Sequence, residues 1–183
     1  DSPNVTLYRN LAKVTVENEA TNFEVTGYAL CNYTSSGTVA PFNPSAPTTP
    51  FTLIDGKPTL PRNPISKTDQ NAADCNMEPK YMFENENFSN DQTYIILKGK
   101  LAETTEELYY KIQLLDTDKN PYPVIRNYHY KIVIKSFSES ANGSTEFADA
   151  KTSEPSNNIY AEIFKESPSI SDNNNNVLTV SNL

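Results

Sequence analysis

Residues 124–136 of this chain read Val-Ile-Arg-Asn-Tyr-His-Tyr-Lys-Ile-Val-Ile-Lys-Ser. From residue 128 onward, apolar and polar side chains alternate, which is the pattern of a β-strand with one buried face. We expect one set to face a core: Tyr128, Tyr130, Ile132 and Ile134. We expect the other set to face outward: Asn127, His129, Lys131 and Lys135. This segment is the clearest strand that the sequence predicts.

The same period of two recurs along the chain, whereas helical periodicity is rare. It predicts further strands at residues 7–16, 23–33, 93–101, 108–115 and 159–164. Residues 102–107 read as a hairpin loop, which places Tyr110, Ile112 and Leu114 on one apolar face of the strand that follows. One short helix is predicted at residues 146–151, capped by Ser144 or Thr145 and ended before Pro155. The predicted fold is all-β: an antiparallel β-sandwich of transthyretin-like or Greek-key type with one short helix.

The strand at residues 23–33 carries one of the two cysteines of the chain. Strict alternation predicts one buried face: Phe23, Val25, Gly27, Ala29, Cys31 and Tyr33. Cys31 is therefore expected on the buried side of a sheet. Together with Cys75 it fits either a single disulfide, if the chain is exported, or two buried thiols.

Residues 34–79 differ from the rest because they hold eight prolines, which cannot donate to a central β-ladder. They predict a domain boundary or a major crossover, with a short edge strand at residues 51–54 as the alternative. The resulting division has four parts. Residues 1–40 form a strand pair belonging to or bordering an N-terminal β domain, 41–80 a Pro-rich connection, 81–166 a C-terminal β-sandwich, and 167–183 a polar leash with a terminal strand.

Charge and hydropathy exclude several classes of function. Fifteen basic against 23 acidic residues give a net charge of −8, which argues against binding to nucleic acid or to an anionic membrane. No stretch approaches the roughly 20 apolar residues of a membrane span. We therefore expect that the chain does not bind nucleic acid and has no membrane-spanning segment.

Residues that could carry catalysis are scarce, and we predict that the chain is not an enzyme. The single histidine, His129, falls on the polar face of its strand, and no nucleophile elbow, P-loop or dinucleotide motif is present. The segment that begins at Asp116 starts like a calcium loop. However, it has Pro121 where that loop needs glycine and Asn127 where it needs glutamate. We predict no metal site and no cofactor.

Three segments together resemble the fimbrillin (FimA/Mfa-like) pilin superfamily of Bacteroidales. The first is Leu-Tyr-Arg-Asn-Leu-Ala-Lys-Val-Thr-Val at residues 7–16, followed by the strand at residues 23–30. The second is the Arg-Asn-x-x-Tyr pattern of Arg126, Asn127 and Tyr130. The third is the helix, proline and strand at residues 147–163.

The resemblance implies a two-domain β-sandwich pilin, exported and proteolytically trimmed, in a fimbrium on the bacterial outer membrane surface. It implies other pilin subunits, identical or paralogous, as partners that join by β-strand addition. We accordingly expect Asp1 and Leu183 to be processing or truncation boundaries. The role expected is that of a structural subunit; the alternative is a fimbrial tip or surface β-sandwich that binds a glycan or a host protein.

The terminal segment 177–183 has the length and β-propensity of a strand that could be donated to a neighbouring subunit. Its candidate contact residues are Val177, Leu178, Thr179, Val180 and Leu183. The alternative is that it completes its own sheet or frays. For the binding role, the candidate exposed aromatic residues are Tyr33, Tyr81, Tyr109 and Tyr122, because sugars stack on such rings.

Overall fold

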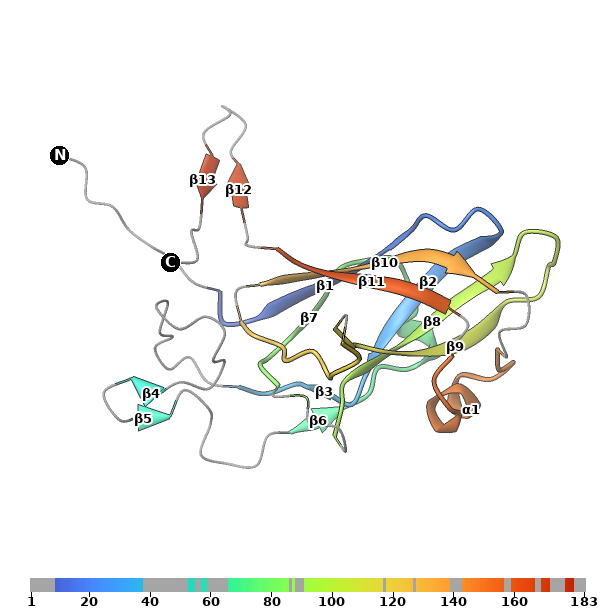
Figure 1. The fold of residues 1–183 in the computed structure, drawn as a ribbon. Helices are drawn as coiled ribbons and strands as arrows, with labels where there is room; N and C mark the ends of the chain where they lie inside the picture. The colour runs from blue at the N-terminus through green and yellow to red at the C-terminus, as the bar shows by residue number, and fades with distance from the viewer. Residues whose placement is uncertain are drawn as a thin grey trace.

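Two β-sheets packed face to face form the body of the protein (Figure 1). The structure is a computed structural model, which describes residues 9–37, 53–54, 57–58, 66–85, 87, 91–116, 118–126, 128–138, 143–156, 159–166, 169–171 and 177–179. The predicted all-β class, with one short α-helix, is confirmed.

The first sheet has the strand order β11-β10-β1-β7. Its strands are β11 (Ile159–Glu166), β10 (His129–Phe137), β1 (Ala12–Asn18) and β7 (Lys80–Met82). β1 runs parallel to β10, with Lys13 opposite His129 and Asn18 opposite Ile134. The other two pairs in this sheet are antiparallel.

The second sheet has the order β2-β8-β9 and is antiparallel throughout. It consists of β2 (Phe23–Cys31), β8 (Tyr94–Leu101) and β9 (Leu108–Gln113). Three two-stranded pairs accompany the sheets. They are β3 (Tyr33–Thr34) with β6 (Lys67–Thr68), β4 (Leu53–Ile54) with β5 (Lys57–Pro58), and β12 (Ser169–Ser171) with β13 (Val177–Thr179).

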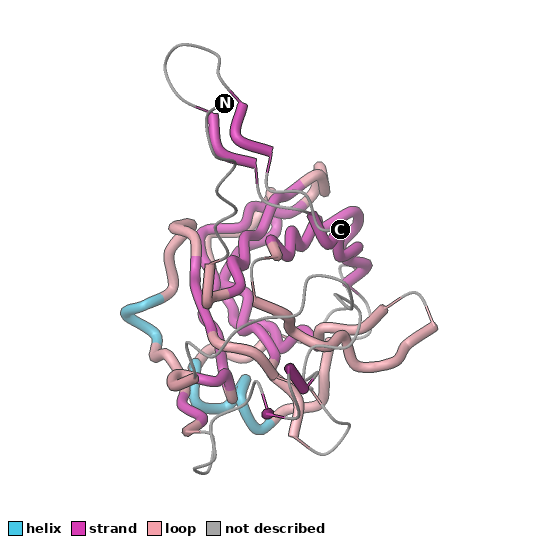
Figure 2. Tube along the Cα trace, turned by 90° about the vertical axis from the view of Figure 1, so that its left-hand side faces the viewer, coloured by secondary structure: helices cyan, strands magenta, loops and turns pink. Residues whose placement is uncertain are grey.

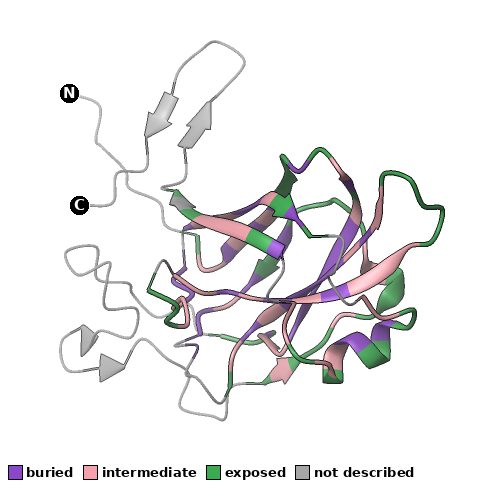
Figure 3. Ribbon diagram, turned by 45° about the vertical axis from the view of Figure 1, so that its right-hand side comes forward, coloured by how far each residue is buried: buried purple, intermediate pink, exposed green. Residues whose placement is uncertain are grey.

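The main core lies between the two sheets, and both contribute buried apolar residues. The buried stretches of their strands are purple in Figure 3. The predicted inward residues of β10 are buried in it, as are those of β1 and β9. They are Tyr130, Ile132, Ile134, Ala12, Val14, Val16, Tyr110 and Ile112. One end of the core is filled by aromatic rings, with Phe23 stacked on Phe137 at 3.8 Å between centroids and the Tyr110 ring edge-on to both. The alternation thus correctly predicted the inner faces of these strands.

Ala29 and Cys31, predicted on the buried face of β2 together with Phe23, are buried, but a β-bulge places them on the opposite face of the sheet from Phe23. Pairing with β8 shifts between Val25 and Gly27. Before the shift Phe23 packs in the main core; after it Tyr28 and Leu30 do so. One inserted residue moves every later side chain to the opposite face. The alternation rule assumes a regular strand and so fails here.

The opposite face of the second sheet carries a smaller apolar cluster covered by α1 (Phe147–Thr152). Ala29, Cys31 and Ile96 from the sheet meet two helix residues, Phe147 and Ala150. Cys31 is therefore buried as expected, but under the helix rather than between the sheets.

The ends of α1 are held differently from the prediction. Its N-cap is Glu146, with no side-chain cap hydrogen bond. Ser144, one of the two predicted caps, instead exchanges backbone hydrogen bonds with Tyr109 of β9. At the other end the Nζ of Lys111 donates to the carbonyl oxygens of Lys151 and Ser153 at 3.0 and 3.3 Å. Cations suit helix C-termini, where carbonyl groups lack partners within the helix.

The domain division predicted from the sequence stays a prediction, but the pairings bear on how it should be drawn. β1 and β2, from the first predicted part, are hydrogen-bonded to β10 and β8, which belong to the part predicted at residues 81–166. β12 lies inside the segment predicted as a leash and pairs with β13 (Figure 2). Within the described residues no helix has both the length and the apolar character needed to cross a bilayer.

Substitution of Gly27 tests the close approach of two backbone segments at the bulge. A Cβ at this position would lie 2.6 Å from the carbonyl carbon of Cys75 and 2.8 Å from the backbone nitrogen of Asn76. Both contacts are with backbone, so relief requires the chain to move. We expect Gly27→Ala to lower the free energy of unfolding by about 1–3 kcal/mol in urea denaturation. The exposed control Glu24→Ala on the same strand should change it by less than about 1 kcal/mol; equal effects would contradict the packing argument.

Candidate functional site

A groove runs along β11 on the side facing β9. It consists of two adjoining hollows of about 370 and 540 Å³ that share part of their lining. Ile112, Ile132 and Ile163 supply apolar lining from three strands, β9, β10 and β11. We call this feature the β11 groove.

The β11 groove borders a strand edge that nothing in the described part of the chain pairs with. β11 is the last strand of its sheet, bonded on one side to β10. β9 is also the last strand of its sheet, but its outer edge is partly covered. Tyr109 exchanges backbone bonds with Ser144, and the Ser156 backbone N–H donates to the Lys111 carbonyl oxygen. An open edge leaves backbone donors and acceptors available to an added strand.

The turn after β9 forms the other wall of the groove, with Asp116 and Lys119 lining both hollows. Its geometry is set by Asp116, whose Oδ1 accepts from the backbone N–H groups of Asp118 and Asn120 at 2.9 and 2.8 Å. Lys119 takes a φ of 65° within this turn. The carboxylate of the calcium-like motif thus holds its own turn together. No group of three or more candidate metal ligands occurs among the described residues.

The outer face of β11 combines aromatic rings and carboxylates. Tyr160 and Phe164 are 52% and 42% exposed, which is high for large apolar side chains. Between them Glu162 accepts a hydrogen bond from the Tyr160 hydroxyl at 2.8 Å. Lys131 and Lys135 of β10 lie within 6 Å of the centroid of the Phe164 ring, in cation–π range.

The family-like residues 126 and 130 are buried and hold the segment before β10. Arg126 forms two bonds of 2.6 Å to the carboxylate of Glu84, and both side chains are less than 5% exposed. The Tyr130 hydroxyl accepts from the backbone N–H of Ile125 and donates to the carbonyl of Pro123. Burial raises the pKa of this phenol, so it stays protonated and able to donate. Asn127, the third residue of the pattern, lies outside the described residues.

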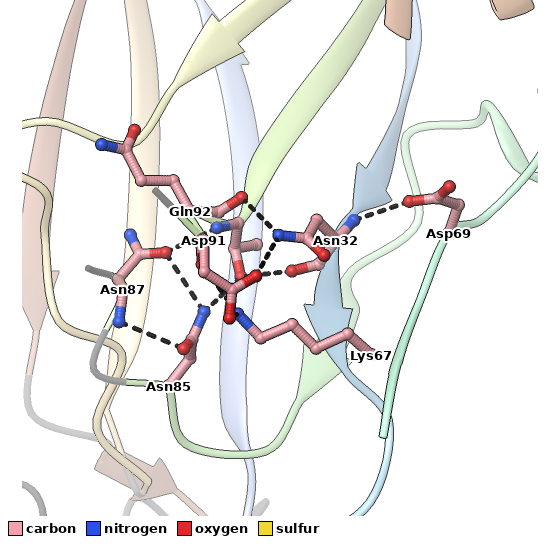
Figure 4. Close-up of polar contacts among 8 residues, drawn as sticks. Asn32, Lys67, Asp69, Asn85, Asn87, Asp91 and Gln92 are labelled. Atoms are coloured by element: carbon pink, nitrogen blue, oxygen red, sulfur yellow. Dashed lines mark hydrogen bonds and ion pairs between the residues drawn. The ribbon is translucent and has the colours of Figure 1, made fainter. Parts of the chain in front are cut away.

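A second candidate site is a network of polar contacts that includes Asn32, Asn85, Asn87, Asp91 and Lys67 (Figure 4). The buried Asn85 amide donates to Asn87 and to the Thr93 hydroxyl, and that hydroxyl donates to the Asn32 carbonyl. Asn32 and Asn87 take φ values of 49° and 61°, which asparagine tolerates better than most residues. The Asn32 amide continues the network outward to Asp91, which pairs with Lys67 at 2.6 Å. These groups bond one another, so we interpret the network as structural.

Both cysteines are free thiols in the structure. Burial raises the pKa of Cys31 to about 12 and that of Cys75 to about 11, so neither is an activated nucleophile. The disulfide stays a prediction. His129 contacts the Thr15 hydroxyl at 2.8 Å and Glu166 at 3.2 Å. Burial, with Lys13 nearby, lowers its pKa, which favours the neutral ring.

The four tyrosines considered for ligand stacking do not form one patch. Tyr81 is exposed on β7, Tyr109 packs beside α1, and Tyr33 packs against the main core. Tyr122 lines the β11 groove. Sequence reasoning missed the two exposed aromatic residues of β11, although their spacing of four places them on one strand face. Of the predicted donor segment, Val177, Leu178 and Thr179 pair with β12 as β13, while Val180 and Leu183 lie outside the described residues.

Comparison with known proteins identifies fimbrial relatives. The chain is 31% identical over 170 residues to the major fimbrium tip subunit FimE of Porphyromonas gingivalis. The match covers 85% of this chain and 30% of the relative, so the chain spans less than a third of that protein. No family model matches.

Solved structures with similarity are also fimbrial or adhesion proteins by name. A putative cell adhesion protein from Parabacteroides distasonis aligns with a TM-score of 0.46 and 16% identity, over 90% of this chain and 54% of that one. The C-terminally truncated tip fimbrial protein Mfa3 of Porphyromonas gingivalis aligns with a TM-score of 0.37 and 17% identity, over 89% and 52%.

The buried pair of Arg126 and Glu84 gives a stability prediction. Arg126→Met should lower the free energy of unfolding by about 3–5 kcal/mol, because Glu84 is left buried without its partner. The double variant Arg126→Met/Glu84→Leu should recover most of the loss in the same urea titration. Lys100→Met, which breaks an exposed pair with Glu24, is the control and should cost less than about 1 kcal/mol. A double variant as unstable as the single one would contradict this account.

Proposed function

Since the similarity to a fimbrium tip subunit supports a fimbrillin-like family for this chain, we propose that it is a structural, non-enzymatic subunit of a surface fimbria. Its place is outside the cell, in a fimbrium on the outer membrane surface. Its partners are other pilin subunits, identical or paralogous, which it joins by β-strand addition at the β11 groove.

The observation that carries the proposal is an open strand edge beside an apolar groove. The outer edge of β11 has no strand partner among the described residues, and hollows of about 370 and 540 Å³ run alongside it. A strand added here would satisfy backbone groups of β11 and cover Ile112 and Ile163 with its own apolar side chains. Hydrogen bonds of this kind give affinity, and the alternate side chains give specificity.

The absence of enzyme chemistry rests on the side chains already described. The phenol of Tyr130 and the thiols of Cys31 and Cys75 are kept protonated by burial. Glu84 is neutralised by Arg126, and Asp116 is engaged by its own turn. These groups stabilise the fold, and none of them is free to activate a substrate in the β11 groove.

The groove can be tested by placing a charge in its lining. In cells that produce the variant in place of the natural chain, Ile163→Asp should abolish or strongly shorten filaments, because an unpaired carboxylate would be buried under the added strand. Met77→Asp is the matched control: Met77 is 43% exposed and does not line the groove, so its filaments should be unchanged. Filament length is measured by electron microscopy.

Folding must be checked alongside assembly. A thermal melt of each purified variant shows whether it is folded, and Ala161→Arg provides a second change in the same lining if Ile163→Asp is not. Filaments of natural length from a folded groove variant would overturn strand addition at β11.

A second function is favoured by the exposed rings at this groove. Tyr122, Tyr160 and Phe164 line the larger hollow together with charged side chains, and a glycan could stack on them. In that case the chain is a tip or surface module that binds a glycan. We expect any binding on a glycan array to fall at least tenfold in Tyr160→Ala/Phe164→Ala, while Tyr81→Ala on β7 leaves it unchanged. An array without hits, with filaments that depend on Ile163, would leave assembly as the function of the groove.

A further inference from the structure

We propose that the β11 groove selects its incoming strand by charge: it prefers a strand that places a basic side chain beside Glu162. This inference rests on the proposed strand addition and states which partner it takes. The expected partner is a segment of another polypeptide that has lysine or arginine between apolar residues. The segment 177–183 of this chain does not meet that requirement.

The side chains that an added strand would meet follow from the alternation of β11. Its outer face presents Tyr160, Glu162, Phe164 and Glu166 in turn, while Ala161 and Ile163 face the groove and core. In a sheet, directly opposite side chains on neighbouring strands lie about 4.5–5.5 Å apart. An outward residue of the incoming strand would therefore stand beside a carboxylate that has an aromatic ring on either side.

Among the side chains that the structure describes, carboxylates outnumber lysines next to this edge. Lys135 of β10 is shared: its Nζ lies 2.7 Å from Glu19 and 3.6 Å from Glu162. The Nζ of Lys131 is likewise shared between Glu166 at 3.3 Å and Glu17 at 3.7 Å. Two lysines thus serve four carboxylates: Glu17, Glu19, Glu162 and Glu166.

Glu162 is the carboxylate best placed for a new partner. Its side chain is 38% exposed, lines the larger hollow and is the more distant partner of Lys135. On the opposite wall of the groove, the positive charge of Lys119 is offset by the carboxylate of Asp116, so the excess of negative charge remains. His129 adds no compensating charge near neutral pH, because the environment of its ring favours the neutral form.

The net charge of the whole chain also favours a basic partner strand. With a net charge of −8, two copies repel each other, and a basic donor segment would reduce that repulsion. No lysine or arginine follows residue 165, so the terminal segment Val-Leu-Thr-Val-Ser-Asn-Leu lacks the complementary charge. If Leu178 and Val180 of that segment faced the groove, Thr179 would stand beside the carboxylates.

Three synthetic peptides test this selection on the purified chain. They are the sequence of residues 177–183 and its Thr179→Lys and Thr179→Glu versions, each carrying a fluorophore. In fluorescence polarisation at low salt, we expect the lysine peptide to bind about two- to fivefold more tightly than the natural one, with the glutamate peptide weakest. The differences in affinity among the three peptides should be smaller at 0.5 M salt, which screens exposed charges.

The contribution of Glu162 is isolated by a matched pair of chain variants. The three peptides should bind Glu162→Gln with nearly equal affinities. Their affinities for Glu103→Gln, which changes an exposed loop position away from the groove, should differ as they do for the natural chain. Equal affinities of the three peptides for the natural chain would overturn charge selection and leave strand addition standing. If no peptide binds at all, strand addition at this groove is wrong, and the selection falls with it.

Discussion

The parallel ladder between β1 and β10 is the constraint on which the rest of the architecture depends. It joins residues that are far apart in sequence; the Thr15 hydroxyl and the His129 ring, for example, bond across 114 positions. A parallel pair cannot be closed by a tight turn, so the chain between the two strands must leave the sheet and return. That excursion contains all of the second sheet. Because pairing over such distances pays the full loop-closure entropy before any contact forms, we expect this ladder to form late in folding.

Strand order follows from that ladder, and the strand order explains the groove. With β1 and β10 in the centre, β7 and β11 are left as the edges of the first sheet. The hairpin of β8 and β9 brings β9 to the edge of the second sheet on the same side as β11. The two edges therefore face each other across the hollows, and apolar residues from both sheets reach the lining.

Local pattern in the sequence predicted the strands but could not predict their neighbours. The alternation in residues 128–134 predicts which side chains face the main core, although Val133 on the other face is buried as well. It says nothing about which strands pair with β10: β11 follows it closely in the sequence, whereas β1 lies more than a hundred residues before it. The bulge in β2 was missed for a related reason. Gly27 inside the strand is compatible with a bulge, but only the pairing with β8 shows that the register changes there, so that Tyr28 and Leu30 face the main core while Ala29 and Cys31 face α1. Site prediction shared this limit: Arg126 and Tyr130 were found through resemblance, whereas the exposed pair Tyr160 and Phe164 needed the position of β11 at an edge.

The distribution of satisfied polar groups separates structural features from functional ones. Around Arg126 and Asn85 the buried donors and acceptors have partners, as the cost of burying an unpaired group requires. Backbone groups on the outer edge of β9 are also partly satisfied, since Ser144 and Ser156 bond to them and α1 covers the nearby face. β11 differs in having exposed aromatic rings, carboxylates that outnumber their lysine partners and, within the described part of the chain, an outer edge without a strand partner. Natural sheets usually protect such an edge against pairing with other chains. On the proposed function, the edge of β11 receives another strand, and the carboxylates along it would then favour a strand with a basic side chain.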